Sequence, residues 1–179
     1  TLALLQEVLG VTTGGAIPRY ESFEALYAAF RRRLAEQVAE VQSQIDGTIN
    51  STPAPLASLL VEGCIENARG YNAGGPKYTV RAPHAGGIPD VANSLLVIRK
   101  LVFEEGRLSL EELVEVLRAD WEGHEGLRRE ISRSFDFYGN DAAEADAMAR
   151  RVFDDFLEEV GRVRDRAGVL RPPGVSTFG

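Results

Sequence analysis

The chain has 179 residues, of which 44% are hydrophobic, and a formal net charge of −7. The length suits a single globular domain, and the acidic balance argues against a nucleic-acid binder, which usually carries a clustered basic surface. One cysteine excludes an internal disulfide and fits a reducing compartment, so we expect a cytoplasmic protein, and no run approaches the ~18 apolar residues of a membrane span.

Apolar spacing predicts helices through the first third of the chain. One is expected over residues 2–10 and a longer one over 23–45, with Ser22 as its N-cap. A proline-rich break at 52–55 ends this part. The helix behind the break is expected to carry the next apolar residues, which are Leu56, Leu59, Leu60, Cys64 and Ile65.

Glycine and proline interrupt the middle of the chain. Residues 70–89 are too punctuated for a helix, and a short strand over 78–80 is the only regular element expected there. Further helices are expected over 90–105, over 109–119 behind a capping box that joins Ser109 to Glu112, over 125–133, and from a capped start at 140–144 to 166. The tail from residue 168 is expected to be a loop and then a strand.

The segment from Gly63 to Tyr78 carries the motifs that point to chemistry. Gly70 and Gly75 have phosphate-loop spacing, but Pro76 separates Gly75 from Lys77 and removes a backbone N–H. Tyr78 stands where a hydroxyl for magnesium is needed. The same segment holds Cys64, with neither histidine near it in sequence, so a buried structural thiol is the favoured interpretation. One cysteine and two scattered histidines do not make a metal site.

Several segments resemble, in one order, the glycyl radical enzymes, which form the pyruvate formate-lyase-like family. Around residues 62–80 the resemblance is nearest to the diol dehydratase and decarboxylase branch. The matching segments extend over essentially the whole chain, at residues 20–26, 64–66, 70–78, 91–95, 98–105, 138–141 and 170–175.

The resemblance implies an α/β fold in which the chain is the mostly helical portion of a large barrel, with few short strands. Residues 1–179 are expected to be a partial barrel domain that lacks both the active-site cysteine loop and the glycyl radical segment, with both ends cut from something longer. Family members carry the radical glycine in Arg-Val-x-Gly-Tyr, whereas Asn67 and Ala68 stand here in place of the arginine and valine. Gly70 is therefore expected to end a helix, and Cys64 to be structural.

The resemblance also implies a function for the parent protein, an anaerobic lyase or dehydratase. An activating enzyme that uses S-adenosylmethionine and an iron–sulfur cluster installs a glycyl radical. The radical passes to a cysteine, which takes a hydrogen atom from a small polar substrate. A C–X or C–C bond of the substrate then breaks. The fragment alone is expected to be inactive, with no catalytic or metal-binding residue. Its contribution is expected to be substrate-lining residues, namely Gly74, Gly75, Tyr78, Val175 and Thr177.

The expected partners are the remainder of the barrel, the activating enzyme, a small-molecule substrate and further copies of the parent in a homo-oligomer, without nucleic acid or membrane. Two other interpretations stay open. The chain could be a non-catalytic helical interaction or scaffold domain, which fits the missing radical segments equally well. It could also be an unrelated small enzyme that uses Cys64 as a nucleophile.

Overall fold

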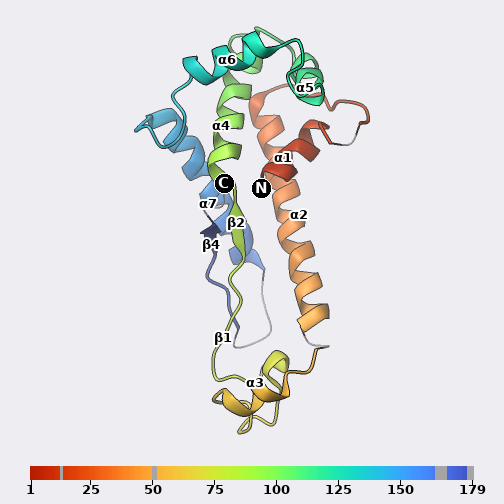
Figure 1. Ribbon diagram of the computed structural model, residues 1–179, viewed down its shortest axis with the longest axis vertical. Coiled ribbons are helices and arrows are strands. Elements are labelled where there is room, and N and C mark those ends of the chain that lie inside the picture. The colour runs from red at the N-terminus through yellow and green to blue at the C-terminus, as the bar shows by residue number, and fades with distance from the viewer. Residues whose placement is uncertain (13, 50–51, 164–168, 177–179) are drawn as a thin grey trace. The chain divides into compact units, whose positions relative to one another are not determined.

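A computed structural model describes residues 1–12, 14–49, 52–163 and 169–176, and it is mostly helical with a few short strands (Figure 1). The contacts between residues divide the chain into two compact units. Unit 1 comprises residues 1–34, 85–156 and 176–179, and unit 2 comprises residues 35–84 and 157–175. The division falls within two long helices, α2 (Phe23–Ile49) and α7 (Ala143–Arg162).

Helices build unit 1, and α1 (Leu2–Leu9) packs along α4 (Ile88–Ile98), as Figure 1 shows. A π-helical turn, η2 (Arg99–Glu104), continues α4, and α5 (Leu110–Arg118) and α6 (Glu125–Ser134) follow. The beginning of α2 and most of α7 complete the unit. The largest fully buried side chains of the described residues all belong to unit 1, and they are Leu5, Leu26, Phe30, Val91, Leu95, Leu96, Leu101, Val114 and Val152.

A polar network fastens α2 to α7 inside unit 1. The Tyr27 hydroxyl donates a 2.6 Å hydrogen bond to Asp155 Oδ2, and the Arg31 guanidinium lies 3.1 Å from Asp155 Oδ1. The Arg151 guanidinium lies over the Tyr27 ring, 3.6 Å from its centroid, and donates two hydrogen bonds to the Glu24 carboxylate. Because Tyr27 is only 3% exposed, these charged groups satisfy a polar atom at the edge of the core.

Unit 2 contains one short helix, α3 (Pro55–Leu60), a 3₁₀ turn, η1 (Tyr71–Ala73), and a parallel strand pair. That pair joins β1 (Thr79–Val80) to β3 (Val169–Leu170), with Thr79 opposite Val169 and Val80 opposite Leu170. A second pair joins β2 (His84–Gly86) to β4 (Gly174–Ser176), and the Gly174 N–H donates to the Pro83 carbonyl at 2.9 Å.

The two units differ sharply in burial. Among the apolar side chains of the described residues, only Cys64 and Val160 are buried in unit 2, whereas unit 1 buries all the others that are buried. Eleven large apolar side chains are exposed in the described part of the chain, and Tyr138 is the single one in unit 1. The other ten, all in unit 2, are Val41, Leu56, Leu59, Leu60, Ile65, Tyr71, Tyr78, Val80, Leu170 and Val175. Hydrophobic burial therefore stabilises unit 1 far more than unit 2.

Most helices predicted from the sequence are confirmed. The capping box at Ser109 forms, since its hydroxyl accepts from the Glu112 N–H at 3.1 Å while the Glu112 carboxylate accepts from the Ser109 N–H at 2.7 Å. Glycine at position 106 also predicts the end of the helix over 90–105, and Gly106 follows η2 with a φ of +59°. The apolar spacing of the last helix also predicts that five residues face the core, namely Met148, Val152, Phe156, Val160 and Val163. The first four are buried, whereas Val163 lies beyond the end of α7 and is half-buried.

Several boundaries were wrong. The helix expected to carry Cys64 and Ile65 ends at Leu60, because the next residues turn and Gly63 takes a φ of +97°. The long helix α2 runs to Ile49 instead of residue 45. At the other end of the chain, α7 stops at Arg162, four residues before the predicted end, and residues 164–168 lie outside the described part of the chain.

Candidate functional site

Residues 63–78, here called the Gly63–Tyr78 loop, form the part of unit 2 in which three of the predicted substrate-lining residues lie. The two ends of the loop are held against each other, because the Lys77 N–H donates to the Glu62 carbonyl at 2.9 Å. A Cβ at Gly63 would stand 2.5 Å from Lys77 N, so a side chain at this position would force the ends apart. The Lys77 ammonium also pairs with the Glu62 carboxylate at 2.8 Å.

Hydrogen bonds also brace the interior of the loop. The Asn67 side-chain amide donates to the Gly75 carbonyl at 2.9 Å, and the Gly75 N–H donates to the Gly70 carbonyl at 3.0 Å. The Arg69 N–H donates to the Cys64 carbonyl at 3.0 Å. Because few apolar side chains are buried in unit 2, we infer that backbone and side-chain amide hydrogen bonds stabilise the conformation of this loop.

The two adjacent glycines serve different local purposes. A Cβ at Gly75 would stand 2.1 Å from the Arg69 carbonyl oxygen, so this glycine permits a close approach of two backbone segments. Gly74 takes a φ of +81°, and a Cβ built on it meets nothing within 4 Å. The pair was predicted to permit a close backbone approach and to line the substrate cavity, and the lining stays an untested prediction. The structure adds a reason for Gly75 that lies within the loop.

Cys64 and Gly70 were both predicted to have structural roles, and the structure shows the surroundings of each. Cys64 is a free thiol that is 3% exposed, so the predicted burial of this thiol is confirmed. It lies in turns after α3 and not on a helix face as predicted. Gly70 was expected to end a helix, which is wrong, because it precedes η1 with an extended backbone at φ −65° and ψ 158°.

Tyr78 is the last residue of the Gly63–Tyr78 loop, and its side chain is exposed. The side chain is 73% exposed, and the structure shows no hydrogen-bond partner for its hydroxyl within the described residues. Val175, on β4, is 42% exposed, and Thr177 lies outside the described residues. Val175 lies in the pair of β2 with β4, whereas Tyr78 immediately precedes β1, which pairs with β3.

His84 is a neighbour of Val175 that the sequence analysis did not select. It lies on β2, the strand paired with β4, and a Cβ at Gly174 would stand 2.8 Å from His84 Nε2. Glycine at position 174 therefore lets the exposed imidazole lie against the strand. Sequence reasoning treated the two histidines as scattered, because the pairing of β2 with β4 joins residues ninety positions apart.

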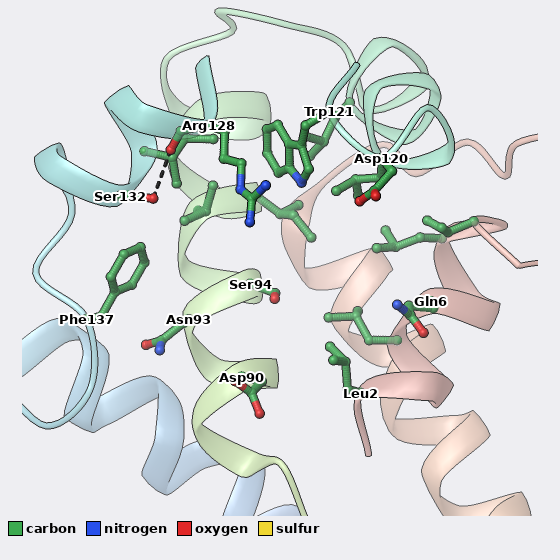
Figure 2. A pocket seen from close by; sticks show the side chains of 18 residues that line it. Leu2, Gln6, Asp90, Asn93, Ser94, Asp120, Trp121, Arg128, Ser132 and Phe137 are labelled. Atoms are coloured by element: carbon green, nitrogen blue, oxygen red, sulfur yellow. Dashed lines mark hydrogen bonds between the residues drawn. The ribbon is translucent and has the colours of Figure 1, made fainter. Parts of the chain in front are cut away.

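Unit 1 has a hollow of its own, of about 700 Å³, between α1, α4, α5 and α6. Figure 2 shows the side chains of Arg128 and Trp121 pointing into it, with Ser94 on the facing helix. Trp121 holds a φ of +66°, an uncommon conformation for a bulky residue. The hollow is lined by the carboxylates of Asp90 and Asp120 and by the Arg128 guanidinium, and no predicted site residue borders it.

The described residues contain no group of three or more histidine, cysteine, aspartate or glutamate side chains that could hold a metal ion. No helix of the described chain is long and apolar enough to cross a bilayer.

Comparison with known proteins identifies the family. The family model described as "Pyruvate formate lyase-like" matches residues 4–179. The trans-4-hydroxy-L-proline dehydratase of Clostridioides difficile is 30% identical over 158 residues, which are 85% of this chain and 20% of the relative. The (2S)-3-sulfopropanediol dehydratase of Klebsiella oxytoca is 31% identical over 172 residues, which are 93% of this chain and 21% of the relative.

Solved structures agree with this result. A glycyl radical enzyme from Archaeoglobus fulgidus superposes with a TM-score of 0.78 at 27% identity, over 96% of this chain and 23% of that one. The chain spans about a fifth of the length of the curated relatives it matches. It belongs to the pyruvate formate lyase-like family of glycyl radical enzymes.

Proposed function

We propose that this chain is part of a glycyl radical lyase or dehydratase that cleaves a C–X or C–C bond of a small polar substrate. The observation that carries the proposal is the family match over residues 4–179. The relatives are a hydroxyproline dehydratase and a sulfopropanediol dehydratase, and both names specify small hydroxylated compounds. We therefore favour dehydration of a compact, hydroxylated substrate.

The proposed place of the chain in that enzyme is a partial barrel domain over residues 1–179. The short strands support this placement, because a two-stranded parallel pair has too little buried surface to be stable alone. The ten exposed apolar side chains of unit 2 support it as well, since further polypeptide would cover them. The radical glycine and the radical cysteine would lie in that further polypeptide, because Asn67 and Ala68 depart from the Arg-Val-x-Gly-Tyr motif before Gly70 and because we assign Cys64 a structural role.

Residues of this chain would then shape the substrate cavity. The Tyr78 hydroxyl can donate a hydrogen bond to a substrate oxygen, and the apolar side chain of Val175 can exclude water. Gly74 would leave room for the substrate, with Gly75 and Thr177 as further lining positions. In the family, the glycyl radical supplies the oxidising equivalent for hydrogen abstraction.

The partners proposed for the parent follow from this assignment. An activating enzyme that uses S-adenosylmethionine and an iron–sulfur cluster would install the radical, and the parent would act as a homo-oligomer in the cytoplasm. A buried, unpaired cysteine suits a reducing compartment.

The test uses the complete reading frame that contains these residues. We expect an Arg-Val-x-Gly-Tyr segment downstream of residue 179 and, after anaerobic incubation with the cognate activating enzyme, a glycyl radical signal in electron paramagnetic resonance. Turnover is then assayed with trans-4-hydroxy-L-proline, 3-sulfopropanediol, propane-1,2-diol and glycerol. A reading frame without the glycine segment, or a protein that never acquires the radical, would refute the proposal and favour a helical scaffold.

A further inference from the structure

The backbone that leads into Tyr78 is fixed at Gly75 and at Lys77, and the Gly75 N–H also donates to the Gly70 carbonyl at 3.0 Å. The first point is the Gly75 carbonyl, which accepts the 2.9 Å hydrogen bond from the Asn67 amide. The second point is the Lys77 N–H, which donates to the Glu62 carbonyl at 2.9 Å. Pro76 lies between them, and its ring restricts φ to about −65°. The hydrogen bonds of Gly75 and Lys77, together with the restricted φ of Pro76, therefore set the direction in which the backbone enters Tyr78.

The Tyr78 side chain, by contrast, makes few contacts with the rest of the described chain. It is exposed, and its ring contacts the Lys77 ammonium at 5.7 Å from the centroid. That ammonium is itself paired with Glu62, the residue whose carbonyl anchors Lys77. Since the phenol has no hydrogen bond within the described residues, its position depends on the backbone anchors beneath it.

The Gly75 carbonyl is bound by the side chain of Asn67, whereas the Lys77 N–H is bound by a backbone carbonyl. The first of these hydrogen bonds therefore depends on the identity of one residue, Asn67. We propose that Asn67 is a positioning residue for Tyr78. Its amide fixes the Gly75 carbonyl and thereby directs the Tyr78 hydroxyl toward the substrate. This inference rests on the proposed function, because it requires that the phenol meets a substrate.

The experiment is a double-mutant cycle in the full-length, activated enzyme, with whichever of the four assayed compounds is turned over. Tyr78→Phe removes the hydroxyl, and we expect kcat/KM to fall about tenfold, the loss typical of one hydrogen bond. Asn67→Ala should lower kcat/KM roughly threefold to tenfold, mainly through KM. In the Tyr78→Phe background, Asn67→Ala should change kcat/KM less than about twofold, because the group that it positions is already gone.

Two further variants isolate the amide donor. Asn67→Asp keeps the size of the side chain but loses the N–H, so it should behave as Asn67→Ala does. The matched control is Asn72→Ala, because the Asn72 amide also donates to a backbone carbonyl, that of Thr52, at 2.8 Å, from the same loop. Asn72→Ala should leave KM unchanged. The radical content per protein and the melting temperature should be the same in all variants.

The outcomes separate the inference from the function that it rests on. A wild-type protein with no radical or no turnover overturns the proposed function, and the inference with it. Wild-type turnover with additive effects of Asn67→Ala and Tyr78→Phe overturns the inference alone. So does an effect of Asn67→Ala that Asn72→Ala matches, or one that appears as lost radical content.

Discussion

The hydrogen bond from Tyr27 to Asp155 offers the clearest test of the packing in unit 1. The change is Tyr27→Phe, which removes the hydroxyl and keeps the ring beneath the Arg151 guanidinium. A hydrogen bond to a charged group contributes about 1.5–3 kcal/mol, and the distance of 2.6 Å with 3% exposure of Tyr27 favours a value of about 2 kcal/mol. For a chain of this size, that loss lowers the melting temperature by roughly 4–8 °C.

The assay is thermal unfolding of the 179-residue chain followed by near-ultraviolet circular dichroism. Tyr138→Phe is the matched control, because that tyrosine is exposed and its hydroxyl has no hydrogen bond within the described residues. The control should stay within about 0.5 kcal/mol of the wild type. If Tyr27→Phe were as mild as the control, the network between α2 and α7 would not contribute to stability and the reasoning would fail.

Alkaline pH tests the same residue independently. Burial, and next the hydrogen bond to Asp155, raise the pKa of Tyr27 above its ordinary value of 10.0. In the unfolded chain the phenol therefore loses its proton first, so the stabilisation is complete below about pH 10 and is lost as pH rises above that value. The melting temperature of Tyr27→Phe should fall less steeply above pH 10 than that of the wild type. Parallel curves would contradict the assigned burial.

Three more predictions concern the loop, a cap and the difference between the units. Gly75→Ala should destabilise the Gly63–Tyr78 loop in the full-length protein by about 3 kcal/mol or more, because the new Cβ would meet backbone atoms. Gly74→Ala should cost about 1–2 kcal/mol, because only its positive φ opposes a side chain. Equal effects of the two substitutions in denaturant unfolding would contradict the close contact at Gly75. Ser109→Ala should lower the melting temperature by about 2–4 °C through loss of the α5 cap, and an unchanged value would show that the cap is dispensable. In the isolated chain, amide hydrogens of α3 should exchange much faster than those of α4, as native-state exchange can report, and equal protection would mean that unit 2 has a core of its own.

The glycines of the Gly63–Tyr78 loop show where sequence reasoning reached its limit. The pattern predicted that Gly74 and Gly75 permit a close backbone approach, and for Gly75 the structure shows such an approach, to Arg69 of the same loop. No spacing rule could supply that partner, because it depends on how the loop folds back. Likewise, His84 comes near Val175 only through the pairing of β2 with β4.

The sequence by itself determined which segments are helical, how α5 begins, and which residues of α7 face the core. These features depend on the 3.6-residue period and on capping groups a few positions away, so local sequence carries them. The tertiary structure alone decided that α3 ends at Leu60, where Lys77 closes against Gly63, and that burial is concentrated in unit 1. Both depend on contacts between residues distant along the chain. Apolar residues with helical spacing are buried in α4 but exposed in α3, so the spacing alone does not predict burial.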